Sequence, residues 1–589
     1  PEDLSAQDAV DLFVDVFTDF PKIINPGHTF LMGPRGVGKS MILRYLESDC
    51  QCIARKCIFS ELPFLGIYIP LKSAGFVKIT EIKRLEDRHA SEIFNEHIMV
   101  SHMGEVIFGG LLNNSHAIES IDADSLMTFY NEILLPLFYP YNLDTTLSAG
   151  KYQCQDILKN IKSLMRNTYK MAGRYVNDLS FTTELPIYKG PLFDYQDFLV
   201  PLLSGLTDVT GFPKGTIYLL IDDAHFLSKT QTRILNSWIA TRTSKKISLK
   251  VSSQYNYKNY YTVTGATIDS PHDYSDIDMT TVYTSSKGPY RERIRRIINS
   301  RLRLAGINTE AEEFFPYDAD QEAAINKIAE EYKAKHDAGE GRGHYRSDDA
   351  VRYARPDFIK NLAGTRKSSS TYSYSGFNQL VHLSSGIVRH FLEPAYQMYS
   401  KEVANKKAPT ISAISPSVQN EISRSEAKKF LFSELEKYEK EGDENAVPKE
   451  KIECLSNLIQ GLGGLFHQIL LSDRSERKIF SIAISDDLSD EVETILNVGV
   501  NFGFFHRSTI GRKDRKSSGR TRLYVMNRRL APLWNLDPTG FAGYLFVKNA
   551  LLEEGICNPH HMLRRIERDG TLQNMEFGQL TLSEFFDGV

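Results

Sequence analysis

The sequence feature that most restricts the possible fold of this chain is a glycine-rich run at residues 33–40. It fits the pattern G-x-x-x-x-G-K-[ST], in which glycines allow the backbone turns that aim N–H groups at phosphates. Within the run, Lys39 is expected to reach the β and γ phosphates of a nucleotide, and the Ser40 hydroxyl is expected to ligate magnesium. The residues expected to contact the nucleotide are Gly33, Pro34, Arg35, Gly36, Val37, Gly38, Lys39, Ser40 and Met41.

The residues on either side of this run have the pattern that a phosphate-binding loop requires. The apolar residues 29–32 lie between Pro26-Gly27 and Gly33 and predict a buried strand, and residues 40–47 predict a helix. The N-terminus of such a helix favours negative charge. Because a chance match would lack this strand and helix, the sequence predicts a P-loop that binds ATP with Mg²⁺.

An acidic pair follows a second apolar strand. Residues 217–221 are apolar and end at Asp222 and Asp223. A carboxylate at a strand end is what a P-loop needs to hold magnesium from the opposite side, so Asp222 is the candidate metal ligand. Asp223 would lie next to the attacking water as a base. The alternative is an ordinary strand end whose Asp caps the following helix, which the P-loop upstream makes the weaker interpretation.

Further strands and helices alternate along the first half of the chain. Residues 65–71 and 247–251 predict strands, and residues 229–241 predict a helix that connects two of the strands. This alternation predicts an α/β fold with a parallel sheet covered on both faces. A helical pattern over residues 91–171 interrupts it and is expected to be an insertion into the sheet domain.

Together these motifs resemble the AAA+ ATPases, and their order resembles the origin-recognition and replication-initiator clade of prokaryotes. In that clade a polar side chain at the next strand end acts as sensor 1, a role that the resemblance gives to Ser252 or Ser253, with Gln254 as a further candidate. A lid-helix Arg after a Gly acts as sensor 2 and reaches the γ phosphate. The resemblance gives that role to Arg389, whose alternative is a solvated surface Arg.

Two features depart from the clade. The second acidic residue is usually Glu, and the shorter Asp223 predicts slow hydrolysis. The long helical insertion is also unusual. AAA+ sites are commonly completed by an arginine finger from a neighbouring subunit, which implies a homo-oligomer. Each candidate finger has a surface charge as its alternative, and the candidates are Arg242, Arg293, Arg296 and Arg301.

The C-terminal block resembles a winged helix, which initiator ATPases carry after the lid. Helices are predicted at 450–471 and 490–500, with strands at 478–483, 504–508 and 521–526. The last two strands flank a basic tip that would neutralise DNA phosphates. Its alternatives are a solvated loop without a ligand and a protein-docking module. The basic residues are Arg512, Lys513, Arg515, Lys516, Arg520 and Arg522.

The expected domain bounds follow from these motifs. They are an AAA+ domain at 1–285 with an insertion at about 75–175, a helical lid at 286–415, a winged helix at 416–545 and a tail at 546–589. Polar Gly- and Ser-rich stretches within 309–375 are expected to form loops, and 401–416 a linker.

Composition restricts the partners. The net charge of −4 gives no global basic field, so DNA contact requires a local patch. The six cysteines are expected to be reduced thiols, since a secreted disulfide framework is unusual in a chain of 589 residues. No apolar run is long enough for a membrane span, so the expected location is the cytoplasm.

The leading functional hypothesis is an ATP-binding and ATP-hydrolysing switch that assembles in the presence of ATP and binds DNA through the winged helix. Its expected setting is anti-phage defence or a mobile element. The alternative is a slow-turnover, nucleotide-gated signalling scaffold that recruits an effector protein. A metabolic kinase would need neither a sensor Arg nor a basic hairpin, and the chain lacks the Asn-Lys-x-Asp motif of GTPases.

Overall fold

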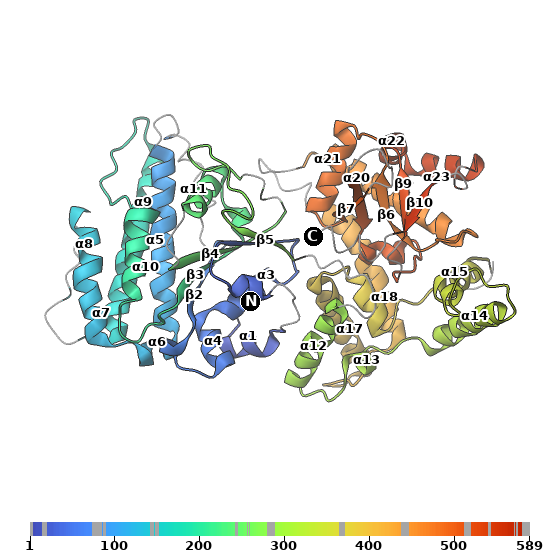
Figure 1. Cartoon of the computed structure of the whole chain (residues 1–589), viewed down its shortest axis with the longest axis horizontal. Coiled ribbons are helices and arrows are strands. Elements are labelled where there is room, and N and C mark those ends of the chain that lie inside the picture. The colour runs from blue at the N-terminus through green and yellow to red at the C-terminus, as the bar shows by residue number, and fades with distance from the viewer. Residues whose placement is uncertain are drawn as a thin grey trace. The chain divides into compact units, whose positions relative to one another are not determined.

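The chain forms two compact units, Pro1–Met279 and Thr280–Val589. Figure 1 shows the ribbon of the computed structural model. The structure describes residues 4–14, 20–72, 85, 90–141, 147, 152–241, 246–255, 257, 260–279, 289–364, 371–436, 447–511, 520–539, 543–570, 572 and 575–579.

A five-stranded parallel sheet organises the first unit. The strand order is β2-β3-β4-β1-β5, and every neighbouring pair is parallel. This confirms the α/β fold expected from the sequence. Because the carboxyl ends of parallel strands meet at one edge, the loops after β1, β3 and β4 lie together there. The strands are β1 (Thr29–Met32), β2 (Phe64–Pro70), β3 (Thr216–Asp222), β4 (Ile247–Ser253) and β5 (Ser275–Asp278).

Both faces of the sheet are buried, as a parallel sheet requires. Ile217, Leu219 and Ile221 of β3 join the core formed with α5 (Ala90–Asn113). The opposite face lies under α3 (Lys39–Leu46) and α4 (Ser48–Arg55), against which α1 (Ala6–Leu12) packs (Figure 1). The short helix α2 (Phe20–Ile24) precedes β1.

Gly66 of β2 explains how closely α3 approaches the sheet. A Cβ atom at this position would lie 2.0 Å from the backbone oxygen of Leu46, the last residue of α3. The hydroxyl of Ser48 at the start of α4 donates to the Gly66 oxygen and accepts from the Gly66 N–H, each at 2.9 Å. The P-loop helix therefore packs directly on the backbone of β2.

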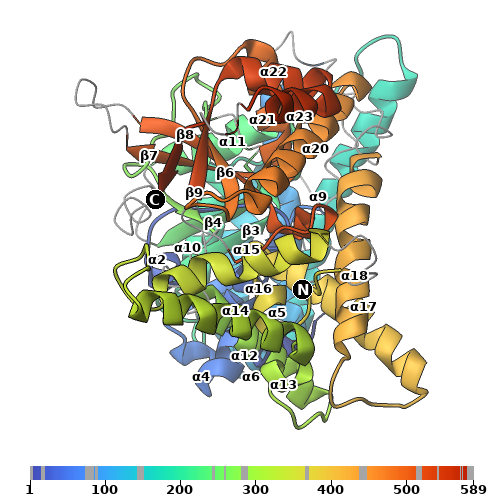
Figure 2. The same ribbon diagram turned by 90° about the vertical axis from the view of Figure 1, so that its right-hand side faces the viewer.

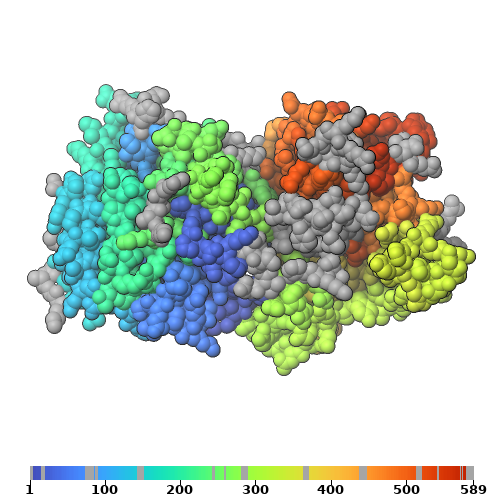
Figure 3. Space-filling model, in the orientation of Figure 1, coloured from blue at the N-terminus to red at the C-terminus, as the bar shows by residue number. Residues whose placement is uncertain are grey.

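The helical insertion lies between β2 and β3 and extends beyond the expected residue 175. Its long helices α5 and α9 pack against each other, and together with the sheet they form a single hydrophobic core. Figure 3 shows its helices, cyan to green, in a continuous surface with the blue N-terminal segments. The elements after α5 are α6 (Ser115–Ser120), α7 (Ala123–Phe129), α8 (Leu135–Phe138), α9 (Cys154–Phe181), η6 (Tyr195–Leu199) and α10 (Val200–Leu206).

Two side-chain hydrogen bonds, one buried and one partly buried, join the insertion to α11 (Lys229–Ala240), the helix that follows the acidic pair. Gln231 Nε2 donates to Asn95 Oδ1 at 3.1 Å, and Trp238 Nε1 donates to Glu96 Oε1 at 2.8 Å. Tyr195 of the insertion stacks on Trp238, with ring centroids 4.8 Å apart. The insertion is thus a part of the sheet domain and not an appended module.

The second unit begins with a helical region. Figure 2 shows α14 and α15 side by side. The expected linker at 401–416 is shorter in the structure, because α17 continues to Lys406 and α18 begins at Pro416. The helices are α12 (Pro289–Leu304), α13 (Ala311–Phe314), α14 (Ala319–Asp337), α15 (Asp348–Gly364), α16 (Phe377–Leu383), α17 (Val388–Lys406) and α18 (Pro416–Lys428).

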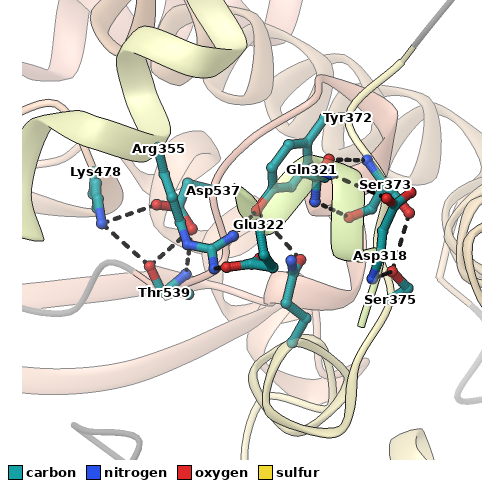
Figure 4. Close-up of polar contacts among 11 residues, drawn as sticks. Asp318, Gln321, Glu322, Arg355, Tyr372, Ser373, Ser375, Lys478, Asp537 and Thr539 are labelled. Carbon is teal, nitrogen blue, oxygen red and sulfur yellow. Dashed lines mark hydrogen bonds and ion pairs between the residues drawn. The ribbon is translucent and has the colours of Figure 1, made fainter. Parts of the chain in front are cut away.

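Residues 372–375 form no helix or strand, as expected of a loop, but this loop is buried. Their side chains are buried, because Gln321 of α14 pairs with the backbone of Ser373 in the way that a neighbouring strand would. Ser373 N–H donates to Gln321 Oε1 at 2.7 Å, and Gln321 Nε2 donates to the Ser373 oxygen at 2.9 Å. Beside this pair, Arg355 binds Glu322 and the hydroxyl of Tyr372 (Figure 4).

A second five-stranded sheet, of order β10-β9-β6-β8-β7, completes this unit. The expected helix–strand–helix–hairpin succession is present. The segment expected to be a tail after residue 545 instead contains two helices and a strand that pairs with β9. The elements are α20 (Lys449–Leu471), β6 (Ile479–Ile484), α21 (Asp490–Asn501), β7 (Phe505–Gly511), β8 (Arg520–Met526), η9 (Arg528–Leu533), β9 (Gly543–Val547), α22 (Asn549–Cys557), α23 (Pro559–Arg568) and β10 (Phe577–Gln579).

Candidate nucleotide-binding site

The loop between β1 and α3 has the backbone conformation that its glycines allow. Gly33, Gly36 and Gly38 have φ values of 152°, 94° and 104°, which residues with a Cβ rarely adopt. Gly38 is the N-cap of α3 and has no side chain to satisfy the N–H groups of the first turn. Those N–H groups, together with the positive end of the helix dipole, suit an anion such as a phosphate.

Lys39 lies folded over this loop. Its side chain is 5% exposed, and Nζ donates to the backbone oxygens of Gly33 at 2.7 Å and Pro34 at 3.0 Å. Burial lowers the pKa of Lys39 to about 8, while the negative charges of Asp223, Asp222 and Asp278 oppose this effect. A poorly solvated ammonium group of this kind gains from an anionic partner.

Asp222 is held by hydroxyl groups from two neighbouring strands. Its side chain is 1% exposed. The hydroxyl of Tyr68, near the end of β2, donates to Oδ2 at 2.7 Å, and the hydroxyl of Ser252 donates to Oδ1. The Ser252 oxygen also accepts the backbone N–H of Asp223 at 2.9 Å. Ser252, predicted as sensor 1, therefore orients the acidic pair.

Asp223 has a backbone and an environment unlike those of its neighbour. Its φ of 62° lies in the left-handed region, and its carboxylate is 26% exposed. Burial and the charge of Asp222 raise the pKa of Asp223 to about 6, against the opposing effect of Lys39. Although Asp223 precedes the short helix η7 (Ala224–Phe226), its side chain makes no capping hydrogen bond. The simple helix-cap interpretation therefore has no support in the geometry.

Three residues at this edge were missed by the sequence analysis. Tyr68 binds Asp222, Asp278 at the end of β5 accepts from the Tyr255 hydroxyl at 2.6 Å, and His225 lies beside Asp223. Tyr68 and Asp278 are at or near the carboxyl ends of parallel strands, so the rule that places sites at this edge would have found them. His225 had no signal beyond its proximity to the acidic pair in sequence.

The predicted sensor 2 residue belongs to the second unit. Arg389 is exposed in the first turn of α17. The preceding turn contains Ser385 and Gly386, with φ values of 51° and 77°. The Ser385 hydroxyl oxygen accepts the backbone N–H of Arg528 at 2.6 Å, which fixes this turn to η9. Contact between Arg389 and a γ phosphate remains a prediction.

Most of the predicted DNA contacts lie outside the described residues, namely Arg512, Lys513, Arg515 and Lys516. Arg520 is exposed at the start of β8, and Arg522 Nη1 donates to Glu493 Oε1 of α21 at 2.5 Å. Arg522 is thus partly neutralised within the protein.

The candidate arginine fingers differ in their surroundings, and none is singled out by its contacts. Among the candidates, Arg242 is outside the described residues, Arg293 is 9% exposed, and Arg296 donates to Glu292 at 2.7 Å.

The edge of the sheet fits a nucleotide-bound magnesium ion. A nucleotide-bound Mg²⁺ keeps phosphate and water ligands and takes only one or two from the protein. Ser40, in the first turn of α3, and Asp222, at the end of β3, are the residues that would supply them. Within the described ranges, no cluster of three or more His, Cys, Asp or Glu could hold a metal by itself. In the same part of the chain, no helix has the length and apolar character needed to cross a membrane.

The chain was compared with protein families, curated proteins and solved structures. A family model described as ORC-CDC6-like matches residues 1–546. The crystal structure of Cdc6p from Pyrobaculum aerophilum matches with 12% sequence identity over 94% of this chain and 93% of that chain, at a TM-score of 0.26. A TM-score this low supports neither a shared domain arrangement nor a shared activity. No curated protein matches the chain.

Proposed function

Because this chain belongs to the ORC-CDC6-like family of AAA+ ATPases, we propose that it is an ATP-driven switch that binds ATP with Mg²⁺ at the P-loop and hydrolyses it. The observation that carries this proposal is the convergence of Lys39 with the acidic pair. Both Asp222 and Asp223 act electrostatically on the Lys39 ammonium group, although they follow it by more than 180 positions in the sequence.

The phosphate groups would be held by the backbone and by Lys39. When ATP binds, Lys39 Nζ would exchange its hydrogen bonds to the Gly33 and Pro34 oxygens for hydrogen bonds to the β and γ phosphates. The ammonium group would then have an anionic acceptor in place of two neutral ones. The first-turn N–H groups of α3 bind the same phosphates. Ser40 and Asp222 hold the magnesium ion, which offsets phosphate charge when bound.

Hydrolysis would use Asp223 to orient the attacking water. The water oxygen bonds to the γ phosphorus as the bond to the β-phosphate oxygen breaks, and the water proton passes to the carboxylate. The Ser252 hydroxyl accepts the Asp223 backbone N–H, so the sheet holds the backbone from which this carboxylate extends. Arg389 would contact the γ phosphate from the lid and make lid position depend on the bound nucleotide.

We further infer that the protein assembles into a homo-oligomer when ATP binds and contacts DNA through the C-terminal hairpin. The concentration of basic residues between β7 and β8 supports DNA contact, because the chain as a whole is slightly acidic. A neighbouring subunit would supply the arginine finger.

The alternative is a nucleotide-gated scaffold that recruits an effector protein, and one observation favours it. The insertion is hydrogen-bonded to α11, close after Asp223, so a nucleotide-dependent shift at the acidic pair would reach the insertion. A short carboxylate at position 223 suits slow turnover. The setting in anti-phage defence or a mobile element, expected for the leading hypothesis, stays a prediction.

The deciding experiment measures ATPase rate against protein concentration, with and without duplex DNA. The wild type is expected to turn over ATP at a rate per subunit that rises with concentration. Lys39→Ala is expected to lose ATP binding and turnover, whereas Lys159→Ala, which removes an exposed lysine of α9, keeps both. Unchanged turnover in Lys39→Ala would contradict the site. Stable ATP retention without turnover or DNA affinity would favour the scaffold.

A further inference from the structure

A largely buried histidine beside the acidic pair has a ring nitrogen without a hydrogen-bond partner. His225 lies in η7, two residues after Asp223, and its side chain is 10% exposed. Its Nδ1 atom is buried and has no hydrogen-bond partner. The Asp223 Oδ1 atom is 3.8 Å away, just outside hydrogen-bond distance. A buried polar atom without a partner is costly, and such atoms are retained where function uses them.

The other ring nitrogen fixes where the proton lies. The Gln254 side-chain nitrogen is 2.9 Å from His225 Nε2. An amide nitrogen can only donate, so Nε2 accepts and the single ring proton of a neutral imidazole is on Nδ1. Gln254 directly follows β4, the sheet neighbour of β3, so the two strands that carry the acidic pair and sensor 1 also bring Gln254 and His225 together.

The ring is held in place and uncharged. It lies against Phe226 with centroids 4.3 Å apart. Burial, with help from the positive charge of Lys39, lowers the pKa of His225 to about 4. The Nδ1–H group is therefore a neutral donor that lies 3.8 Å from an oxygen of Asp223, the more exposed of the two carboxylates.

We propose that His225 is a positioning residue for ATP hydrolysis, donating its Nδ1 proton in a hydrogen bond to one oxygen of Asp223 so that the other oxygen faces the attacking water. Gln254 maintains the required tautomer. This inference rests on the proposed ATPase function of the same site. Closing the 3.8 Å separation requires only a small rotation of the Asp223 side chain, which the bound nucleotide would favour by attracting the second oxygen toward the water.

The short side chain of Asp223 explains why a hydrogen bond from His225 would matter for hydrolysis. A carboxylate on one methylene has a shorter reach than the Glu usual in AAA+ sites, so its direction matters more. A hydrogen bond at one oxygen restricts rotation of the carboxylate and leaves a single oxygen for the water.

The test compares His225→Leu, which removes the donor, with His225→Asn, whose amide nitrogen can occupy the position of Nδ1. ATP affinity is measured with a fluorescent ATP analogue, and kcat and KM are measured at saturating Mg²⁺. We expect His225→Leu to lower kcat about 10- to 100-fold, as for a misplaced catalytic group, with ATP affinity within about twofold of wild type. His225→Asn should recover most of the lost kcat.

A double variant shows whether His225 acts through Asp223. In an Asp223→Asn background, His225→Leu should have little further effect, because the carboxylate it positions is already gone. His560→Leu, which removes an exposed histidine of α23, is the control and should behave as wild type.

Each outcome separates the inference from the proposed function. Wild-type turnover that persists unchanged in His225→Leu would overturn the positioning role and leave the ATPase assignment intact. Loss of ATP affinity in His225→Leu, or failure of His225→Asn to recover turnover, would make the residue structural and would also overturn the role. Absence of turnover in the wild type itself would overturn both.

Discussion

Lys250 is a buried ammonium group in the middle of β4, on the face covered by α3. Its Nζ atom donates to the backbone oxygens of Asn25 at 2.6 Å and Gly27 at 2.8 Å, and to the Thr29 hydroxyl at 3.1 Å. It also lies 4.9 Å from the centroid of the Tyr218 ring. These contacts tie the segment that enters β1 to the centre of the sheet, which positions the start of the P-loop.

This lysine should make stability depend on pH. Burial lowers the pKa of Lys250 from 10.5 to about 7. Between these values the unfolded chain binds more protons than the folded chain, so folding stability rises with pH from about 7 to 10. The rise for one such group is at most about 1.4 kcal/mol per pH unit.

The measurement is urea unfolding at several pH values, with the first unit followed by Trp238 fluorescence. The free energy of unfolding of the wild type should rise with pH over this range. Lys250→Met fills a similar volume and has no titratable group, so its stability should change less over the same pH range. Parallel pH profiles for the two proteins would show that Lys250 keeps its charge after folding.

Tyr68 offers a test of the metal side of the site. Its hydroxyl holds Asp222 Oδ2, and groups that orient a metal ligand typically change metal affinity about 10- to 100-fold. Tyr68→Phe is therefore expected to raise the Mg²⁺ concentration needed for half-maximal ATPase rate, with ATP binding in excess Mg²⁺ little changed. Tyr396→Phe, an exposed tyrosine of α17, is the control. An unaltered Mg²⁺ requirement in Tyr68→Phe would contradict the assignment of Asp222.

Among single residues, the sequence indicated those that belong to a local motif and missed those defined only by contacts with distant parts of the chain. Lys39 and Asp222 follow from a local pattern and from a strand end. Tyr68 and His225 act through contacts whose partners are separated by up to 154 positions, and neither residue type signals the contact.

At the scale of elements, the close approach of α3 to β2 gives a matched pair of glycine variants. Gly66→Ala places a Cβ against the Leu46 backbone, which cannot rotate away as a side chain would, and should destabilise the protein by about 1–3 kcal/mol or more. Gly173→Ala, in the exposed face of α9, meets no atom within 4 Å and should stabilise the helix by up to about 1 kcal/mol. Thermal unfolding midpoints should move in opposite directions. Equal shifts would show that α3 can move away from the sheet.

The strands and long helices were predictable because their apolar residues repeat at regular spacing. The burial of the loop 372–375 was not predictable, since Tyr and Ser alone do not indicate it and Gln321 of α14 satisfies the Ser373 backbone. The two helices after residue 545 were missed because they are short and β10 is only three residues long. Over so few residues, the repeat of apolar positions is a weak indication of a helix or strand.

At the scale of the whole molecule, the net charge of −4 should make the proposed DNA binding depend on a few local positive charges. Replacing the four basic residues of the hairpin tip with Ala should weaken DNA binding and reduce the slope of log affinity against log salt by up to about 4. The variant carries Arg512→Ala, Lys513→Ala, Arg515→Ala and Lys516→Ala. The measurement is DNA binding by fluorescence anisotropy from low to moderate salt.

A second fourfold variant with the same loss of charge is the control, and it changes basic residues of α9 instead. It carries Lys159→Ala, Lys162→Ala, Arg166→Ala and Lys170→Ala. Only the hairpin variant should lose affinity. Equal losses in both would mean that binding follows net charge and not the hairpin.

The shared core of the sheet and the insertion restricts how a chain like this can diverge. If residues 90–206 were deleted, Ile217, Leu219 and Ile221 would lose the helices that shield one side of β3 from water. A shorter descendant would have to acquire polar residues at these strand positions or a replacement helix in the same step. Gradual shortening of the insertion is therefore expected to destabilise the sheet domain.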